Sequence, residues 1–297
     1  MVRVAFTSDL HIDITSQNRR LLPNLSDRIE ELHPDVLVLA GDLGNDLSAW
    51  RETLRQFQSL SMPKLVVPGN HDVWLESKRA LQRTQDSAWK YNHALPGCAE
   101  EFGFQYLPTK PVVFGEVAFV GSLGWYDYSV RDQRLDGIIS IREYERGQFE
   151  AGSWNDVRYA AWLRYPASND WRKRRLLLTD AEVCKSMRDS LDRDLASLPR
   201  TVEKIIAVVH TCPFEGCIER RTQPDPFDAY EGSSHIGEIL SRYSDRHEIV
   251  VICGHRHSYL DIVENGVRVV RRPVGYLNGF DGDFRQKASE AIGLLDV

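Results

Sequence analysis

The sequence contains no long apolar run, no internal repeat and no low-complexity stretch. No segment approaches the roughly 20 consecutive apolar residues of a membrane-spanning helix, so we expect no membrane partner. The first residues, MVRVAFTSDLH, lack the cationic start and the apolar core of a signal peptide, and they predict an immediate β-strand. These absences together favour a cytoplasmic location.

Positive charge is not in excess either. The chain of 297 residues carries 37 Lys and Arg against 43 Asp and Glu, for a net charge of −6. Proteins that bind a long polyanion usually present a basic face, so extended nucleic-acid binding is disfavoured. The basic run Trp171–Arg175 is interpreted as a solvated surface and not as a polyanion site.

Cysteine is scarce and odd in number, with five residues in the chain. Because no secretory signal is present, reduced thiols are expected and not a disulfide framework. Cys212 and Cys217 lie close together in the sequence, but no second pair completes a four-ligand zinc site. A structural zinc ion is therefore disfavoured.

Five apolar runs dominate what is present. Most are β-branched or Leu-rich without polar alternation, which is typical of strands buried on both faces: 2–7, 36–40, 64–68, 205–209 and 249–253. Between the first three runs, apolar residues recur at helical spacing. They are Leu25, Ile29 and Leu32 in one segment, and Leu47, Trp50, Leu54 and Phe57 in the next. This alternation of strand and helix predicts an α/β fold.

The remaining stretches predict smaller features. Residues 112–122 fit two strands around Gly115-Glu116, and residues 259–272 fit a hairpin around Asn265-Gly266. Residues 122–200 are rich in Trp, Tyr and Arg, and they predict an insertion or cap beside the site. Helix starts are expected in it at Ser153 and at Thr179, where Glu182 completes a capping box.

Each of the five apolar runs leads directly into a polar cluster. The carboxyl ends of strands in α/β sheets are where ligands bind, so these clusters are expected to meet at one site. Asp and Asn are common in turns after strands, which would explain a single cluster, but turns do not require histidine. The clusters are Asp9-Leu10-His11, Gly41-Asp42, Gly69-Asn70-His71-Asp72, His210 and Gly254-His255-Arg256-His257.

In that order, the five clusters resemble the motifs of the calcineurin-like metallophosphoesterase superfamily. The resemblance runs from Asp9 to His257. It implies a four-layer αββα sandwich, with two mixed β-sheets flanked by helices and a helical insertion near the active site. Residues 1–297 would form one domain, with residues 122–200 as the insertion. Residues 121–129 and 227–240 resemble a bacterial branch of the superfamily whose substrates are poorly defined.

The resemblance also implies a ligand set for two divalent ions. One ion would be held by Asp9, His11 and His257, the other by Asn70, His210 and His255, with Asp42 bridging both. Oxygen and nitrogen donors without thiolate suit Mn²⁺, Fe or Zn²⁺, and Mn²⁺ is the ion we expect.

His71 is expected beside the substrate phosphate, where it would protonate the leaving oxygen. Asp72 would orient His71, or alternatively cap the following helix. Asn70 and His71 would also contact the substrate. Trp125 and Tyr126 could wall the pocket, although an aromatic core cluster is the alternative.

These residues predict a hydrolase of phosphate esters that uses a metal-bridging hydroxide as nucleophile. A phosphodiesterase acting on a small phosphoester is favoured, because the acidic chain argues against long duplex DNA. The alternatives are a phosphomonoesterase or a nuclease with the same site. A non-catalytic scaffold is disfavoured because the ligand set is complete.

Overall fold

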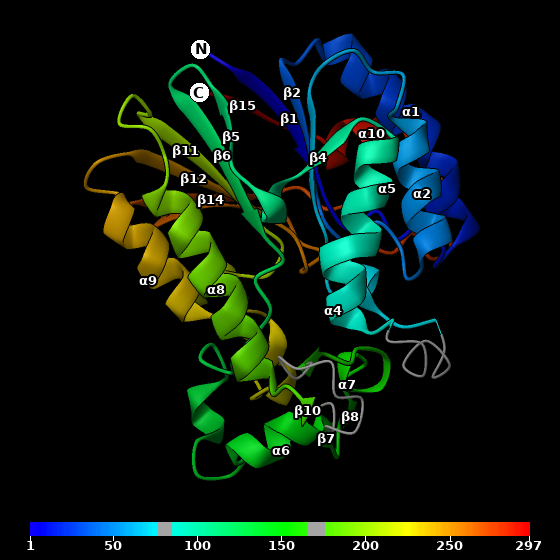
Figure 1. Ribbon diagram of the computed structural model, residues 1–297. Helices are drawn as coiled ribbons and strands as arrows, with labels where there is room; N and C mark the ends of the chain where they lie inside the picture. The colour runs from blue at the N-terminus through cyan, green and yellow to red at the C-terminus, as the bar shows by residue number, and fades with distance from the viewer. Residues whose placement is uncertain (77–84, 165–175) are drawn as a thin grey trace.

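The computed structural model describes residues 1–76, 85–164 and 176–297 (Figure 1). The basic run at 171–175 therefore lies outside the described residues. Within the described part of the chain, none of the helices has the length and apolar character needed to cross a membrane.

The first of two large sheets contains five strands in the order β15-β1-β2-β3-β4. Strands β1 to β4 run parallel, and β15, near the end of the chain, pairs antiparallel with β1. Their bounds are β1 Arg3–Thr7, β2 Val36–Ala40, β3 Lys64–Val67, β4 Phe104–Tyr106 and β15 Gly293–Asp296. The predicted strands at 2–7, 36–40 and 64–68 are thus confirmed, with bounds that differ only at their ends.

The second sheet contains six strands in the order β13-β14-β12-β11-β6-β5. The predicted hairpin is confirmed, since Asn265 and Gly266 adopt the positive φ values of 51° and 78° that such a turn requires. The strands are β5 Val112–Phe114, β6 Val117–Ser122, β11 Lys204–Val209, β12 Glu248–Cys253, β13 Leu260–Glu264 and β14 Val267–Arg271. Both sheets mix parallel and antiparallel pairs, as predicted.

Helices cover the outer faces of the two sheets (Figure 1). Beside the first sheet lie α1 Ser16–Leu32, α2 Leu47–Gln56, α5 Leu95–Glu101 and α10 Phe284–Ala291. A short helix α4, Ser87–Trp89, continues through a π-helical turn into α5. Beside the second sheet lie α8 Asp180–Ala196 and α9 Ser234–Tyr243. The predicted α/β architecture, two mixed sheets flanked by helices, is therefore confirmed.

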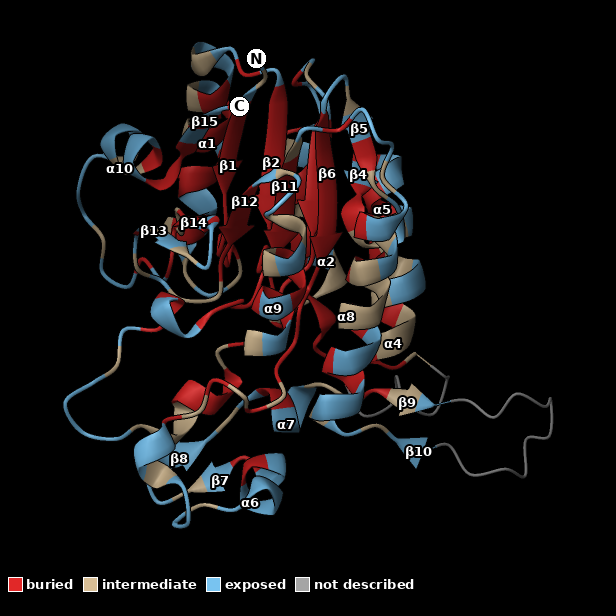
Figure 2. Cartoon of the chain, turned by 90° about the vertical axis from the view of Figure 1, so that its left-hand side faces the viewer, coloured by how far each residue is buried: buried red, intermediate tan, exposed pale blue. Residues whose placement is uncertain are grey.

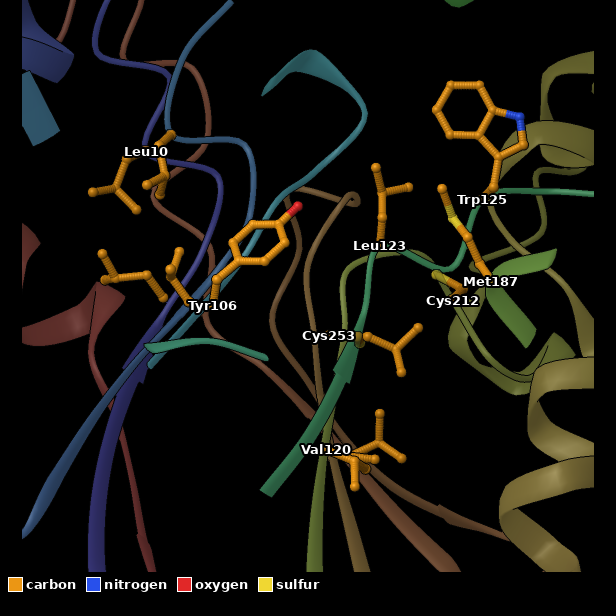
Figure 3. Close-up of a cluster of buried hydrophobic side chains, with 14 of the residues drawn as sticks. Leu10, Tyr106, Val120, Leu123, Trp125, Met187, Cys212 and Cys253 are labelled. Carbon is orange, nitrogen blue, oxygen red and sulfur yellow. The ribbon is translucent and has the colours of Figure 1, made fainter. Parts of the chain in front are cut away.

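The central strands are buried on both faces because each sheet packs against the other sheet on one side and against helices on the other, whereas the edge strand β13 is partly exposed (Figure 2). Phe6 and Val38 of the first sheet share a core with Phe119 and Ile206 of the second. Alternate strand residues face the helices and form a larger core. Figure 3 shows part of that core, including Leu123, Trp125, Met187, Cys212 and Cys253.

The predicted insertion at 122–200 contains two kinds of structure. Its last part is α8, which lies against β6 in the outer layer and begins with the predicted capping box of Thr179 and Glu182. The described residues 131–164 and 176–177 lie beyond the sheets and are largely exposed (Figure 2). They include α6 Ile141–Arg146, β7 Gln148–Phe149, β8 Gly152–Ser153, α7 Asp156–Tyr159, β9 Leu163–Arg164 and β10 Leu176–Leu177.

The helix start predicted at Ser153 is wrong. Ser153 ends β8, and α7 begins at Asp156 with Asn155 as its N-cap. The Asp156 carboxylate does not cap a helix but accepts hydrogen bonds from side chains far away in the sequence. A local sequence pattern cannot distinguish these two uses of an aspartate.

Candidate metal centre

The five predicted clusters meet at the carboxyl ends of β1, β2, β3, β11 and β12, where the two sheets lie side by side. Parallel strands bring their ends to one edge, so ligands far apart in the sequence become neighbours. Most of the predicted ligands are buried: the exposed fraction is 0% for Asp9, His11 and His210, 1% for Asp42 and 2% for Asn70.

The backbone at this site adopts an uncommon conformation. Asp9, His11, Asp42 and His255 have positive φ values of 54°, 44°, 55° and 70°. Non-glycine residues reach this region at a cost of roughly 1–3 kcal/mol each, and such residues gather at functional sites. The strain is explained if these side chains must converge on a common ligand.

The first group of donor atoms comes from Asp9, His11 and His257. The Nε2 atoms of His11 and His257 are 3.1 Å apart, and His257 Nε2 is 3.6 Å from Asp9 Oδ1. Donors about 2.1 Å from one ion lie roughly 3–3.5 Å from each other. These three residues therefore fit a divalent ion.

The second group comes from Asp42, His210 and His255, together with Asn70. His210 Nδ1 donates to the Ala40 carbonyl at 2.8 Å, which leaves Nε2 as the nitrogen available to a metal. That Nε2 lies 3.4 Å from Asp42 Oδ2 and 3.3 Å from Asn70 Oδ1. Asn70 Oδ1 is also 2.9 Å from His255 Nδ1.

Asp42 lies between the two groups. Its Oδ2 atom is 3.5 Å from His11 Nε2 on one side and 3.4 Å from His210 Nε2 on the other. This position is compatible with a carboxylate that bridges two ions. Which residue binds which ion stays a prediction.

Burial and charge set the protonation of the site. Burial lowers the pKa of His11 and of His255 to about 3. Burial opposes the charged form of His210, but the Asp42 carboxylate raises the pKa of that ring to about 9. Burial would raise the pKa of Asp42, yet the neighbouring His210 and His71 hold it well below its usual value. Metal binding requires charged carboxylates and neutral imidazoles, so an ion at this site would have to displace the proton that His210 carries.

Two glycines let the backbone approach the ligands. A Cβ atom on Gly69 would lie 2.1 Å from Asp42 Oδ1. A Cβ atom on Gly41, which has φ +89°, would lie 2.5 Å from His210 Nδ1. The glycines of the GD and GNHD motifs thus leave the space that the ligands occupy.

Asp72 does not make the contact that was predicted for it. Its buried carboxylate does not contact the His71 ring but joins the loops after β2 and β3. Burial and the nearby Asp42 raise its pKa to about 8. It accepts backbone N–H bonds from Gly69 at 2.7 Å, Asp42 at 2.8 Å, Leu43 at 3.0 Å and Gly44 at 3.1 Å. The prediction that Asp72 orients the His71 ring is therefore corrected.

The His71 ring is held instead by Asn45 and Trp74. Its Nδ1 lies 2.7 Å from Asn45 Oδ1, and the ring stacks on Trp74 with centroids 3.7 Å apart. One ring nitrogen also lies within 4.8 Å of donor atoms of His11 and Asp42. His71 therefore lies at the edge of both metal groups. Asn45 belongs to none of the five motifs, and no sequence signal pointed to it.

A cavity of about 280 Å³ opens over the site. Trp125 and Tyr126 do not line it; each is 1% exposed, and their rings stack in the core at 4.8 Å. The predicted role of these two rings as pocket walls is corrected in favour of the core alternative. The described side chains that line the cavity, besides the candidate ligands and His71, are Trp74, Ser153, Trp154, Asn155, Asp156, Phe227, Glu231 and Tyr276.

Residues 2–259 match the family of calcineurin-like phosphoesterases. The chain belongs to this family. The matched residues contain both groups of clustered His and Asp side chains, which could bind metal, and the family is one of phosphoester hydrolases. No curated protein matches the sequence.

Solved structures support the fold of this metallophosphoesterase. A phosphopantetheinyl hydrolase (PptH) from Mycobacterium tuberculosis is 19% identical with a TM-score of 0.70, over 98% of this chain and 95% of that chain. A dimetal phosphatase from Danio rerio is 14% identical with a TM-score of 0.52, over 91% and 86%. The protein TT1561 of Thermus thermophilus is 12% identical with a TM-score of 0.51, over 99% and 98%.

Proposed function

We propose that the protein is a two-metal phosphodiesterase for small substrates. The observation that carries the proposal is the composition of the cavity wall. Among the described residues that line the cavity, none is Lys or Arg, whereas Asp156 and Glu231 are carboxylates. The described part of the wall therefore adds no Lys or Arg charge to that of the ions, and it suits a phosphate with one negative charge better than one with two.

Aromatic side chains supply the rest of the wall. Trp154 and Phe227 lie with ring centroids 6.0 Å apart, and both line the cavity. Tyr276 lines the cavity beside His257, with its centroid 4.5 Å from that ring. A diester has two ester arms, and flat apolar rings of this kind accommodate such an arm by stacking.

The candidate ligands would hold two ions, with Asp9, His11 and His257 on one and Asn70, His210 and His255 on the other, bridged by Asp42. Bound divalent ions would neutralise phosphate charge and lower the pKa of a water molecule at the site. His71 then protonates the leaving oxygen. Asn45 accepts from Nδ1 of His71, which leaves Nε2 to carry the transferred proton.

The test compares two synthetic substrates with the same leaving group. The value of kcat/KM for a bis-aryl phosphate should exceed that for the mono-aryl phosphate by tenfold or more, about 1.4 kcal/mol of discrimination. Asp42→Asn, assayed in parallel, should lose both activities and so exclude a contaminating phosphatase. A tenfold preference for the monoester would overturn the phosphodiesterase assignment in favour of a phosphomonoesterase.

We also propose Mn²⁺ as the native ion and the cytoplasm as the location. The donor set contains oxygen and nitrogen but no thiolate, which suits Mn²⁺. All five cysteines are free and buried, as expected for a reducing compartment. Reconstitution of the chelated protein with Mn²⁺, Fe²⁺ or Zn²⁺ tests the first point, with the highest kcat expected for Mn²⁺.

A further inference from the structure

We propose that Asp156, the first residue of α7, is a positioning residue that fixes the amide of Asn70 toward the second metal group. The proposal rests on the metal centre described above but not on the choice of substrate. Asp156 belongs to none of the five motifs, and 86 residues separate it from Asn70 along the chain. Only the fold brings the two side chains together.

The contact with Asn70 decides which way its amide points. Asn70 Nδ2 lies 3.0 Å from Asp156 Oδ1 and 3.2 Å from Oδ2. A carboxylate only accepts hydrogen bonds, so it selects the NH₂ side of the amide. The opposite atom, Oδ1, is thereby turned toward His210 and His255, where an oxygen donor is needed.

The same carboxylate also holds two tryptophans. Trp74 Nε1 donates to Asp156 Oδ1 at 2.6 Å, and Trp154 Nε1 donates to Oδ2 at 2.9 Å. Trp74 in turn stacks on His71. Asp156 is 2% exposed, so these bonds form away from solvent, where a missing partner is costly.

The amide variant at this position makes a specific test. In Asp156→Asn, one acceptor oxygen is replaced by an NH₂ group that faces other donors. The side-chain amide of Asn70 can then relieve the clash by flipping, which would turn its nitrogen toward the second metal group. An amide NH₂ group has no free electron pair to donate to a metal ion. Loss of an outer partner of this kind typically lowers metal affinity about 10- to 100-fold.

Asp180→Asn is the matched control. Asp180 is also a carboxylate that accepts from an indole, since Trp125 Nε1 donates to it at 2.7 Å, but it contacts no candidate ligand. Calorimetric titration of the metal-free proteins with Mn²⁺ should show one of two binding events weakened at least tenfold in Asp156→Asn. Both events should be unchanged in Asp180→Asn, and thermal melting should show that both variants are folded.

Two further variants show which metal group is responsible for the weakened binding event. His257→Ala removes a donor from the first group. In this variant, adding Asp156→Asn should weaken binding of the ion that remains in the second group. His255→Ala removes a donor from the second group. In this variant, adding Asp156→Asn should leave the affinity for the ion in the first group unchanged. Equal weakening in both backgrounds, or unchanged Mn²⁺ binding in folded Asp156→Asn, would overturn the proposal. Because binding is measured without substrate, these outcomes do not depend on the phosphodiesterase assignment.

Discussion

At the scale of single residues, the candidate ligands of the metal centre are tightly packed. Four of its residues have positive φ, and glycines pack against the ligands. The sequence motifs therefore encode both the donors and the space around them. A substitution that adds one carbon atom beside a ligand should act as strongly as removal of the ligand.

Gly69→Ala tests this directly. The added methyl group would lie 2.1 Å from Asp42 Oδ1, so the carboxylate between the two groups must move. We expect metal content to fall and kcat/KM to drop about 10- to 100-fold, as for the loss of an outer partner of a metal ligand, while the protein remains folded. Gly97→Ala in α5 is the control, because a Cβ atom there meets nothing within 4 Å. Full activity in Gly69→Ala would contradict the close-packing argument.

His71→Ala separates proton transfer from metal binding. General acid catalysis contributes about 10²–10⁴-fold, so kcat should fall within that range for alkyl esters, whose leaving groups need a proton. Aryl esters with activated leaving groups should lose less. Metal analysis should show both ions retained. A variant that lost its ions instead would show that His71 is a ligand, since the ring lies close to donor atoms of His11 and Asp42.

The grouping of the candidate ligands could be predicted from the sequence because each follows a recognisable buried strand. Asn45 and Asp156 could not, because a single Asn or Asp in a polar loop looks like an ordinary turn residue. Trp125 and Tyr126 were expected at the pocket for a related reason. Sequence shows that an aromatic pair follows a strand, but it does not show that the Trp125 indole donates to Asp180 or that the Tyr126 ring stacks on it.

At the scale of elements, strands and capped helices were predictable where apolar runs are continuous. The elements between β6 and α8 were not, since β7, β8, β9 and β10 contain two residues each. Such short pairs depend on long-range partners and carry no periodicity of their own. This segment nevertheless supplies Trp154 and Asp156 to the cavity.

The short 3-10 helix Pro226–Tyr230 supplies another wall of the cavity through Phe227. Phe227→Ala should raise KM for a bis-aryl phosphate roughly three- to tenfold, which corresponds to the 0.5–1.5 kcal/mol of an aromatic contact. The value of kcat should change little. Phe280→Ala, which removes a ring that packs on Phe284 and does not line the cavity, should leave KM unchanged. Equal effects of the two changes would argue against an aromatic substrate subsite.

At the scale of the whole molecule, the buried histidines predict how stability depends on pH in the metal-free protein. His11 has its pKa lowered to about 3 by burial, against roughly 6.5 in an unfolded chain. The unfolded state therefore binds the extra proton between these values, and the contribution of His11 to stability is lost as pH falls from about 6.5 toward 3, whereas Asp72, whose pKa is raised to about 8, acts in the opposite direction. His255 acts in the same direction as His11.

Chemical denaturation of the metal-free protein between about pH 6.5 and pH 4 checks this prediction. His11→Asn removes one of the titrating groups, so stability should fall less steeply with decreasing pH, by up to about 1.4 kcal/mol per pH unit for one proton. His93→Asn, which changes an exposed histidine outside the metal groups, should keep the wild-type slope. Identical slopes in all three proteins would show that His11 is protonated in the folded state.

The order of the ligands along the chain has a consequence for biosynthesis. Asp9, His11, Asp42 and Asn70 are translated first, whereas His210 follows Asn70 by 140 residues and the last two histidines come later still. Strand β15, near the end of the chain, also pairs with β1 beside the first ligands. A nascent polypeptide that has emerged only as far as α8 lacks every donor supplied by the second sheet. With the proposed ligand set, both metal groups would be complete only after the second sheet is synthesised, and a chain released midway would be unable to hold both ions.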